Sequence, residues 1–370
     1  MPLDDVIDAG DPRWSEFLRK FPRHDFYHLP AYVTLEAERR GGRARAYVYH
    51  DNLGTMMIPF VESSAPLAMQ PSGLPTQDAL APYGYTSPLV ELRGGERENG
   101  ELLARVLERL AEHLRQRNIC AMLMRFHPLL PVPQASFRTH GRLVTHGETV
   151  WCNLRQSPEA LWGETRGRYR SYIHALEREG YQVEFDPAGR DMDAFFEIYY
   201  DTMRRVNAAP DYFFSKEYLQ SLQKLLGERF LLAHVRSPAG RIVSSGFFTF
   251  CQGLVQYHLS GNDIGDEGAN ALKLLLHRVR LQARDAGYEK FHLGGGVGAR
   301  KDSLFQFKSG FSPQRATFCT WRMVVDQPAY DRLCRQWERL NRAMADPPEG
   351  FFPAYRKMLP PPPAIERRCA

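Results

Sequence analysis

The feature that most constrains the fold of this chain is an order of helix-type and strand-type segments that occurs twice. In the first half, two helix-type segments, two strand-type segments, a Pro- and Gly-rich stretch, a long helix and a strand follow one another at 11–21, 25–42, 43–50, 55–62, 66–88, 101–118 and 120–126. In the second half, two helix-type segments lie at 193–206 and 213–227, and two strand-type segments joined by a turn lie at 230–250. A third strand, a helix and a last strand follow at 254–261, 269–287 and 288–296. A strand–helix–strand unit with a right-handed crossover is the central element of an α/β sandwich. The chain is therefore predicted to hold two tandem α/β domains of one fold, each a mixed central sheet flanked by helices.

The joint between the two copies is expected near residue 150. A strand at 149–154 leads to Ser157 and Pro158, which suit the start of a helix reaching about residue 179. We therefore predict an N-terminal domain over 1–150 and a C-terminal domain over 151–345 that carries the active site. Four consecutive prolines follow, and they predict an extended tail over 346–370.

Composition excludes several classes of protein. The 370 residues contain no run of about 18 apolar residues and no leader-like N-terminus, so we expect no membrane span, no signal peptide and a cytoplasmic protein. The cysteines are scattered, without a metal-ligand spacing or a neighbouring base, so neither a metal site nor a cysteine nucleophile is expected; they are Cys120, Cys152, Cys251, Cys319, Cys334 and Cys369. The oligomeric state is not predicted.

One segment of the chain is basic and aromatic, although the net charge of the whole chain is only +5. It interleaves two tyrosines with four arginines: Arg166, Arg168, Tyr169, Arg170, Tyr172 and Arg178. Such a segment can contact the phosphates of a nucleotide-linked acceptor or of a tRNA. It can equally be the solvated face of an amphipathic helix, and the sequence leaves both interpretations open.

The strand at 254–260 has an unusual polar row. Period-two alternation places Gln256, His258 and Ser260 on one face, whereas a central strand is normally apolar on both faces. This row predicts a cleft, with His258 either catalytic or a satisfied core histidine. The loop 263–267 that follows carries three carboxylates, which would repel the pyrophosphate of a coenzyme A.

The segment after the last strand of the second copy combines glycines with a lysine held among aromatic residues. The glycines at 294–296 form no complete dinucleotide fingerprint, so we expect Gly295 to allow close passage of a substrate. Asp302 is a suitable N-cap for a short helix, and Lys308 lies between Phe307 and Phe311. A lysine in that setting can hold a developing oxyanion, or can be a surface lysine lying over aromatic core residues.

Several motifs resemble those of the FemABX family, the peptidoglycan-bridge aminoacyltransferases and the wider FemAB-like group of GNAT proteins. The matching strings are PYGYTSPL at 82–89, RFHPL at 125–129, TVWCNL at 149–154, RGRYRSYIHALEREGYQV at 166–183, YHLSGND at 257–263 and DSLFQFKSGF at 302–311. The last resembles the F-K-x-G-F signature of that family. The resemblance implies two tandem GNAT-like domains, in agreement with the repeat.

The resemblance also implies an activity, namely transfer of an aminoacyl group from aminoacyl-tRNA to an amine. Lys308 would stabilise the tetrahedral intermediate with help from the Phe307 backbone, and His258 or Asp302 would take the proton of the amine. Substrate-binding residues are expected within the matching strings and the polar strand: Tyr83, Tyr85, Arg125, His127, Arg168, Arg170, Gln256, Ser260, Asn262, Gly295 and Phe311.

The identity of the acceptor stays open. The chain lacks the long coiled-coil insertion of some Fem proteins, so a peptide, a nucleotide-linked amine and a natural-product amine are all possible. No cofactor is expected besides the co-substrate. The alternatives are an N-acyltransferase that uses acyl-CoA and a non-catalytic GNAT-like binding module.

Overall fold

The computed structural model describes residues 3–66, 76–263, 270–341 and 350–357. The first part of the chain forms β1 (Leu3–Asp8), α1 (Arg13–Leu18), α2 (Pro30–Arg39), β2 (Arg43–His50), β3 (Gly54–Ser64), β4 (Gln77–Leu80), β5 (Leu89–Leu92), α3 (Glu96–Gln116), β6 (Ile119–Arg125), α4 (Gln134–Thr139) and β7 (Arg142–Asn153). The remainder forms α5 (Pro158–Glu164), α6 (Gly167–Arg178), β8 (Gln182–Asp186), α7 (Met192–Arg205), α8 (Lys216–Leu226), β9 (Phe230–Arg236), β10 (Ile242–Cys251), β11 (Leu254–Asn262), α9 (Ala271–Asp285), β12 (Lys290–Gly294), α10 (Ser303–Lys308), β13 (Arg315–Val324) and α11 (Gln327–Leu340).

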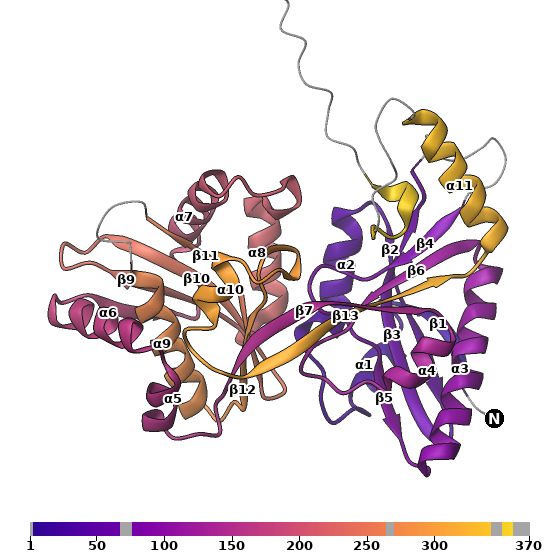
Figure 1. Ribbon diagram of the computed structural model, residues 1–370, viewed down its shortest axis with the longest axis horizontal. Helices are drawn as coiled ribbons and strands as arrows, with labels where there is room; N and C mark the ends of the chain where they lie inside the picture. Colours follow the sequence, from indigo (N-terminus) through magenta and orange to yellow (C-terminus); the bar gives the residue numbers. More distant parts are fainter. Residues whose placement is uncertain (1–2, 67–75, 264–269, 342–349, 358–370) are drawn as a thin grey trace, which may run out of the picture.

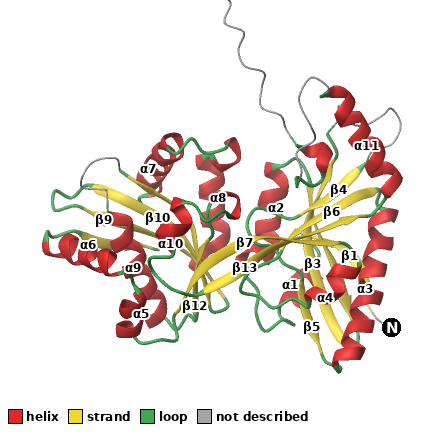
Figure 2. Cartoon of the chain, in the orientation of Figure 1, coloured by secondary structure: helices red, strands yellow, loops and turns green. Residues whose placement is uncertain are grey.

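The described strands form one mixed sheet that runs through two lobes (Figures 1 and 2). Its order is β1-β2-β3-β4-β6-β13-β7-β12-β11-β10-β9-β8, with β5 paired to β3. The pairs β4–β6 and β11–β12 are parallel, and the other neighbours are antiparallel. Read from either end towards the middle, the sheet shows the same sequence of strands, which confirms the predicted α/β fold with two tandem copies.

The two copies exchange a strand at the centre of the sheet. β13, from the C-terminal part of the chain, pairs with β6 of the first copy, while β7 pairs with β12 of the second copy. β7 and β13 also pair with each other and join the lobes (Figure 1). The expected boundary at residue 150 thus falls within β7. β13, expected with the C-terminal domain, thus spans the junction of the lobes. α11, also expected with that domain, lies on the first lobe, where Leu333 and Trp337 pack in one cluster with Cys120.

Apolar side chains fill both faces of each half of the sheet. α3 presents one stripe to the first lobe, and its buried members are Leu102, Leu103, Val106, Leu107, Leu110 and Leu114. This spacing of three and four residues is the pattern of an amphipathic helix packed on a sheet. A third cluster joins the lobes, because Phe26, Tyr27 and Tyr32 of the first copy pack with side chains of α7, α8 and β10.

The sequence missed several local features. The helix expected over 158–179 is two helices, because Thr165 adopts an extended conformation and its hydroxyl accepts a 2.7 Å hydrogen bond from buried Arg280. β1 and β8 were not expected, and the third strand of the first copy, β4, lies within the Pro- and Gly-rich stretch. Most of the acidic loop after Asp263 lies outside the described residues. Of the tail expected to be extended over 346–370, residues 350–357 are described, and they are not extended throughout: Ala354–Arg356 forms a short helical turn, and buried Tyr355 donates a 2.6 Å hydrogen bond to Asp78.

Candidate active site

Asp302 connects the glycine-rich turn to α10, the helix that carries the predicted lysine. One of its carboxylate oxygens accepts a 2.9 Å hydrogen bond from the Phe305 N–H and caps α10, as predicted. The other oxygen accepts a 2.8 Å bond from the Val297 N–H and so holds the glycine-rich turn against the helix. Both oxygens are therefore engaged, and the geometry gives Asp302 a positioning role rather than that of a free base.

Lys308 ends α10 and points inward. Lys308 is only 8% exposed, and its Nζ donates a 2.7 Å hydrogen bond to the Gly295 carbonyl. Nζ also lies 5.7 Å from the centre of the Tyr257 ring. Burial lowers the pKa of Lys308 to about 8, although the Asp302 carboxylate opposes this shift. The lysine is thus a poorly solvated ammonium near neutral pH, as an oxyanion-binding group requires.

Bare glycine backbone makes room for this ammonium. Gly294 has a positive φ of 80°, and a Cβ at this position would lie 3.2 Å from Lys308 Nζ and 3.8 Å from the Tyr85 hydroxyl. Lys308 and Tyr85 therefore face the same piece of backbone from two different lobes. A side chain at position 294 would be strained and would crowd both groups.

The neighbouring Phe307 is fixed by its backbone. Its carbonyl accepts a 3.2 Å hydrogen bond from the hydroxyl of Tyr169 on α6, and the rings of Phe307 and Phe311 pack edge to face. Lys273 of α9 lies 5.7 Å from the centre of the Phe307 ring. α6, α9 and α10 thus meet at the F-K-x-G-F signature and leave little freedom to its backbone.

A buried hydrogen-bonded network crosses between the lobes and reaches His292 of β12, two residues before Gly294. Asp25, from the segment before α2, accepts hydrogen bonds at one oxygen from His127 Nε2 at 3.0 Å and from Gln256 Nε2 at 2.6 Å. The amide oxygen of Gln256 lies 2.8 Å from His292 Nδ1. Asp25, His127, Gln256 and His292 are all almost fully buried.

Two members of this network, Asp25 and His292, were not predicted. His292 lies two residues before the glycine cluster, in the string FHLGGG, and that proximity is the one available signal for it. Asp25 lies 231 residues from Gln256, so nothing local indicates its partner.

Arg125 and Tyr85 line the junction of the lobes. Arg125 Nε donates a 2.6 Å hydrogen bond to the Gly84 carbonyl, and its guanidinium lies 5.0 Å from the ring centre of Phe318 and 6.0 Å from that of Tyr85. Among the described residues, no carboxylate forms an ion pair with Arg125. The outer nitrogens of the guanidinium are therefore available for an anionic group.

His258 lies in an aromatic box rather than beside Lys308. The rings of Phe26, Tyr27, Tyr83 and Phe247 surround it at 5.4–6.3 Å. Burial lowers its pKa to about 4, so His258 is neutral at physiological pH. The box is close to the 82–89 loop, which Tyr83 anchors through its N–H to buried Glu36 at 2.9 Å.

The polar row expected on β11 is broken by an irregularity. The pairing with β10 shifts between Phe247 and Phe248, opposite His258, so one extra residue is inserted in β11. Ser260 consequently turns to the face of Tyr257 and bonds to its hydroxyl, away from Gln256 and His258. Asn262, at the end of the strand, contacts Thr202 of α7 through its backbone.

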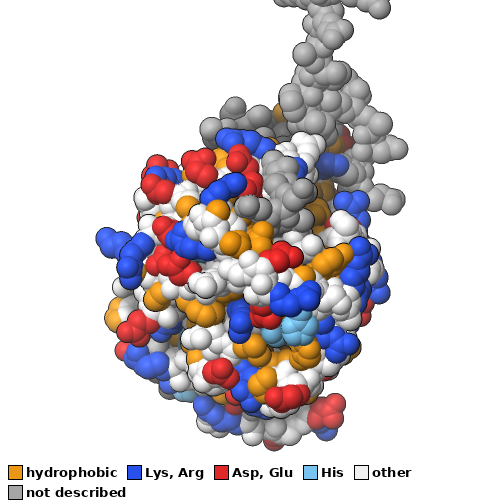
Figure 3. Space-filling model, turned by 90° about the vertical axis from the view of Figure 1, so that its left-hand side faces the viewer, with side chains coloured by type: hydrophobic (Ala, Val, Ile, Leu, Met, Phe, Trp, Pro, Cys, Tyr) orange, Lys and Arg blue, Asp and Glu red, His pale blue; other side chains and the backbone are white. Residues whose placement is uncertain are grey.

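The basic segment forms α6. Arg166 and Arg168 are exposed and lie over Tyr169 and Tyr172, with the Arg168 guanidinium 5.3 Å from the Tyr172 ring centre. Arg170 is half-buried. On the face of the second lobe in Figure 3, basic and acidic side chains are interspersed with exposed apolar ones, so the arginines do not extend into a uniformly basic surface in that view.

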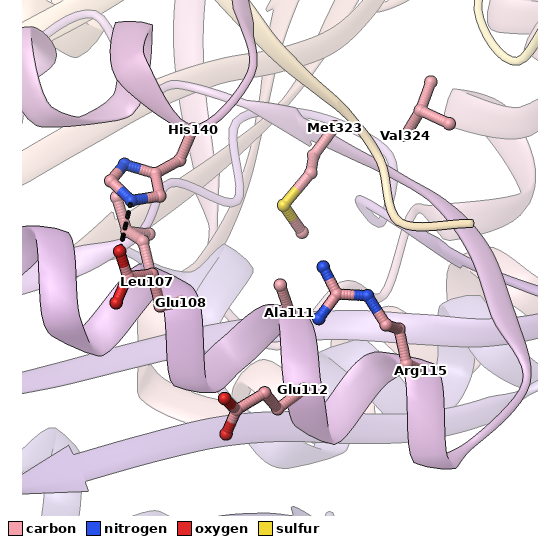
Figure 4. A pocket seen from close by; sticks show the side chains of 8 residues that line it. All are labelled: Leu107, Glu108, Ala111, Glu112, Arg115, His140, Met323 and Val324. Carbon is pink, nitrogen blue, oxygen red and sulfur yellow. Dashed lines mark ion pairs between the residues drawn. The ribbon is translucent and has the colours of Figure 1, made fainter. Parts of the chain in front are cut away.

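Two hollows of the first lobe lie apart from this site. One, of about 360 Å³, lies between α3, His140 and the end of β13, and in Figure 4 His140 points towards Glu108 from 3.9 Å. The other, of about 410 Å³, lies beside Gly41 and Arg117. Neither contains a residue of the Lys308 site.

In the part of the chain that the structure describes, no three His, Cys, Asp or Glu side chains gather as metal ligands. Also within that part, every helix is either too short or too polar to cross a bilayer.

Comparisons with known proteins agree with this architecture. A family model described as an acetyltransferase (GNAT) domain matches residues 163–308. No curated protein matches the sequence significantly. Among solved structures, FemX has a TM-score of 0.65 at 14% identity, covering 88% of this chain and 99% of FemX.

Two other structures are similar over nearly their whole length. L-PGS from Bacillus licheniformis has a TM-score of 0.54 at 15% identity, covering 89% of this chain and 96% of its own. A conserved protein of unknown function from Bacteroides thetaiotaomicron has a TM-score of 0.56 at 11% identity, with coverages of 87% and 100%. The fold and the matched domain are those of GNAT-type acyltransferases. The expected resemblance to the FemABX-like group is confirmed at the level of the fold.

Proposed function

We propose that this protein is an amide-forming aminoacyltransferase that moves an aminoacyl group from aminoacyl-tRNA to an amine of a peptide, nucleotide-linked or natural-product acceptor. The observation that carries the proposal is the buried ammonium of Lys308, held at the Gly295 carbonyl over bare glycine backbone. A charge in a poorly solvated position stabilises a developing anion far more than the same charge in water does.

The transfer is a direct one. The neutral amine attacks the ester carbonyl, the new C–N bond forms, and the carbonyl electrons move to oxygen. One N–H of the Lys308 ammonium donates a hydrogen bond to that oxygen, while another remains hydrogen-bonded to the Gly295 carbonyl. The C–O bond to the tRNA ribose then breaks, the carbonyl re-forms, and the ribose oxygen takes up the proton that the amine nitrogen has lost.

Arg125 supports an acceptor or donor with an anionic group near the reacting centre. Its guanidinium lies 6.0 Å from the ring centre of Tyr85, and the hydroxyl of Tyr85 lies, like Lys308 Nζ, within 4 Å of the position that a Cβ on Gly294 would take. Arginine binds phosphate or carboxylate in a two-pronged manner. A nucleotide-linked amine or a peptide with a free carboxylate would satisfy it.

The exposed arginines of α6 support a tRNA as donor. α6 adjoins the F-K-x-G-F segment through Tyr169, so a phosphate backbone bound at Arg166 and Arg168 would run close to the reacting centre. Contacts to phosphates of this kind supply affinity without sequence recognition.

An acyl-CoA donor is the second candidate, because the matched family model describes an acetyltransferase domain. The acidic loop that speaks against coenzyme A on electrostatic grounds lies mostly outside the described residues. The two donors therefore have to be compared directly.

The test is a donor and acceptor screen with purified protein. Pools of tRNA charged with labelled amino acids are incubated with the protein, with and without a panel of amines, in parallel with labelled acyl-CoA. We expect one amino acid to leave the tRNA and to appear in an amide only when its acceptor is present. Transfer from acyl-CoA alone would establish the second candidate, and binding of either donor without turnover would establish a non-catalytic module.

A further inference from the structure

The tautomer of His292 is set by a chain of hydrogen bonds that begins in the other lobe. Both N–H groups that reach Asp25 Oδ2 must donate, because a carboxylate only accepts. Gln256 therefore turns its NH₂ group to Asp25 and its oxygen to His292, so His292 Nδ1 is the protonated nitrogen and donates to Gln256 at 2.8 Å.

The same chain leaves a bare lone pair on the other side of the ring. His292 Nε2 is buried and has no hydrogen-bond partner among the described residues. A buried polar atom without a partner is costly and calls for an explanation. The ring centre of His292 lies 5.1 Å from that of Tyr85, and the charge of Lys308 acts on the imidazole.

We propose that His292 Nε2 is the base that takes the proton of the attacking amine, with Gln256 and Asp25 as positioning residues. The inference rests on the proposed transfer reaction. It assigns the proton acceptor to a residue other than Asp302, whose two oxygens are engaged in the loop, and other than His258, which lies in the aromatic box.

Attack forms the C–N bond and leaves an ammonium nitrogen and an oxyanion on one tetrahedral carbon. His292 Nε2 takes one proton from that nitrogen and becomes an imidazolium, which Gln256 and, behind it, Asp25 stabilise. When the C–O bond breaks, the imidazolium returns this proton to the departing ribose oxygen, and His292 is neutral again.

The basicity of His292 depends on whether an oxyanion lies beside Lys308. Burial, His127 and the ammonium of Lys308 all hold the pKa of His292 well below its usual value, so the empty site has a neutral imidazole. An oxyanion beside Lys308 cancels the effect of that ammonium and makes His292 more basic at the moment when the proton must move. The titratable groups that face the ring are Lys308 from α10, His127 from the segment after β6, Tyr85 from the 82–89 loop and, through Gln256, Asp25.

A first measurement tests the tautomer without any substrate. In protein labelled with ¹⁵N-histidine, long-range ¹H–¹⁵N spectra distinguish a protonated from a bare ring nitrogen, and His292→Asn assigns the signal. We expect His292 to be protonated at Nδ1 and bare at Nε2. In Asp25→Asn the amide of Gln256 can turn over, and we expect the proton to move to Nε2. A proton on Nε2 in the wild-type protein would overturn the proposal.

A second measurement tests the base in the transfer reaction. The amide nitrogen of His292→Asn can replace Nδ1 as donor to Gln256, but this variant has no counterpart of Nε2. We expect its single-turnover rate to fall about 100-fold or more, with KM unchanged. The matched control is His234→Asn on β9, which alters another fully buried histidine whose Nε2 has no hydrogen-bond partner among the described residues, and it should transfer at the wild-type rate.

The outcomes separate the two levels of the proposal. An active wild-type protein with an equally active His292→Asn variant would overturn the role of His292 and leave the proposed function intact. A wild-type protein that transfers no aminoacyl or acyl group would overturn the proposed function, and the role of His292 with it.

Discussion

The two lobes have the same strand order, but the residues at the ends of the corresponding strands β6 and β12 differ. β6 of the first lobe is followed by the buried apolar side chains of Phe126, Leu129 and Leu130, and by His127, which is hydrogen-bonded to Asp25. β12 of the second lobe runs into Gly294–Gly296, where only backbone is present.

The short helices that follow β6 and β12 differ in the same way, because one buries an apolar side chain and the other a charged one. α4 and α10 both have six residues and both precede a strand that joins the lobes. α4 inserts Phe137, which is 0% exposed and packs against the Trp321 ring at 5.1 Å. α10 inserts Lys308. Duplication thus supplied one scaffold twice, and a change from apolar filling to bare backbone and a buried cation distinguishes the lobe that we propose to be catalytic.

The strongest test of this comparison replaces the two inserted side chains and measures stability. Phe137→Ala should lower the free energy of unfolding by about 3–5 kcal/mol, the usual cost of emptying an aromatic core position. Lys308→Met should raise it at pH 7, because burial depresses the lysine pKa from 10.5 to about 8. At about 1.4 kcal/mol per pKa unit, the upper limit of this gain is about 3 kcal/mol.

The stability difference between Lys308→Met and the wild-type protein should depend on pH. Between pH 8 and 10.5 the unfolded chain binds a proton at Lys308 that the folded chain has released, so wild-type stability rises over this range. The advantage of Lys308→Met should therefore be complete below pH 8 and vanish by about pH 10.5. Urea denaturation at several pH values measures it. A Lys308→Met variant less stable than wild type at pH 7 would contradict a strained, desolvated lysine.

The second test concerns catalysis. Lys308→Met should lower the rate of transfer by about 100- to 1,000-fold, as the loss of an oxyanion-binding donor does. Lys301→Met is the matched control, because Lys301 is exposed and pairs with Glu148 at the surface. Single-turnover transfer from the donor identified in the screen gives the rates. Equal rates for the two variants would remove Lys308 from the mechanism.

The contrast between the lobes also shows what sequence can predict. Hydrophobic periodicity and turn residues depend on neighbours along the chain, so most helices and strands could be placed. β4 could not, because its four residues lie within a Pro- and Gly-rich stretch. The exchange of β7 and β13 depends on pairing between distant strands, which no local pattern records.

The same limit applies to the site. Lys308, Gly295 and Gln256 lie in conspicuous strings. The structure joins Lys308 to Gly295 by a hydrogen bond and places Gln256 against His292, whereas their roles in the reaction stay predictions. Asp25 has no signal of its own, because its function depends on a partner from the other lobe. The position of Ser260 was wrong for a related reason, since one inserted residue reverses the alternation of a strand.

A third and smaller effect is expected at the glycine turn. Gly294→Ala and Gly298→Ala both place a side chain at positive φ, 80° and 61° respectively, and both should lose about 1–2 kcal/mol of stability. Only Gly294→Ala brings a Cβ within 3.2 Å of Lys308 Nζ, whereas nothing lies within 4 Å at position 298. We therefore expect kcat to fall about tenfold in Gly294→Ala alone, which corresponds to about 1.4 kcal/mol. Equal kcat values would show that crowding at position 294 leaves Lys308 undisturbed.

The smallest effect concerns the donor. Arg168 of α6 is exposed and stacks on Tyr172, and no described carboxylate is ion-paired with it, so it can neutralise one phosphate of a tRNA. Arg168→Ala should raise KM for the charged tRNA a few-fold and reduce the slope of log K against log salt by about one. Arg204→Ala is the control, since Arg204 is equally exposed but pairs with Asp201 on α7. Because Arg168 lies on the lobe that carries Lys308, a loss confined to Arg168→Ala would place donor and chemistry on one copy of the fold, whereas identical salt slopes would place the tRNA on another surface.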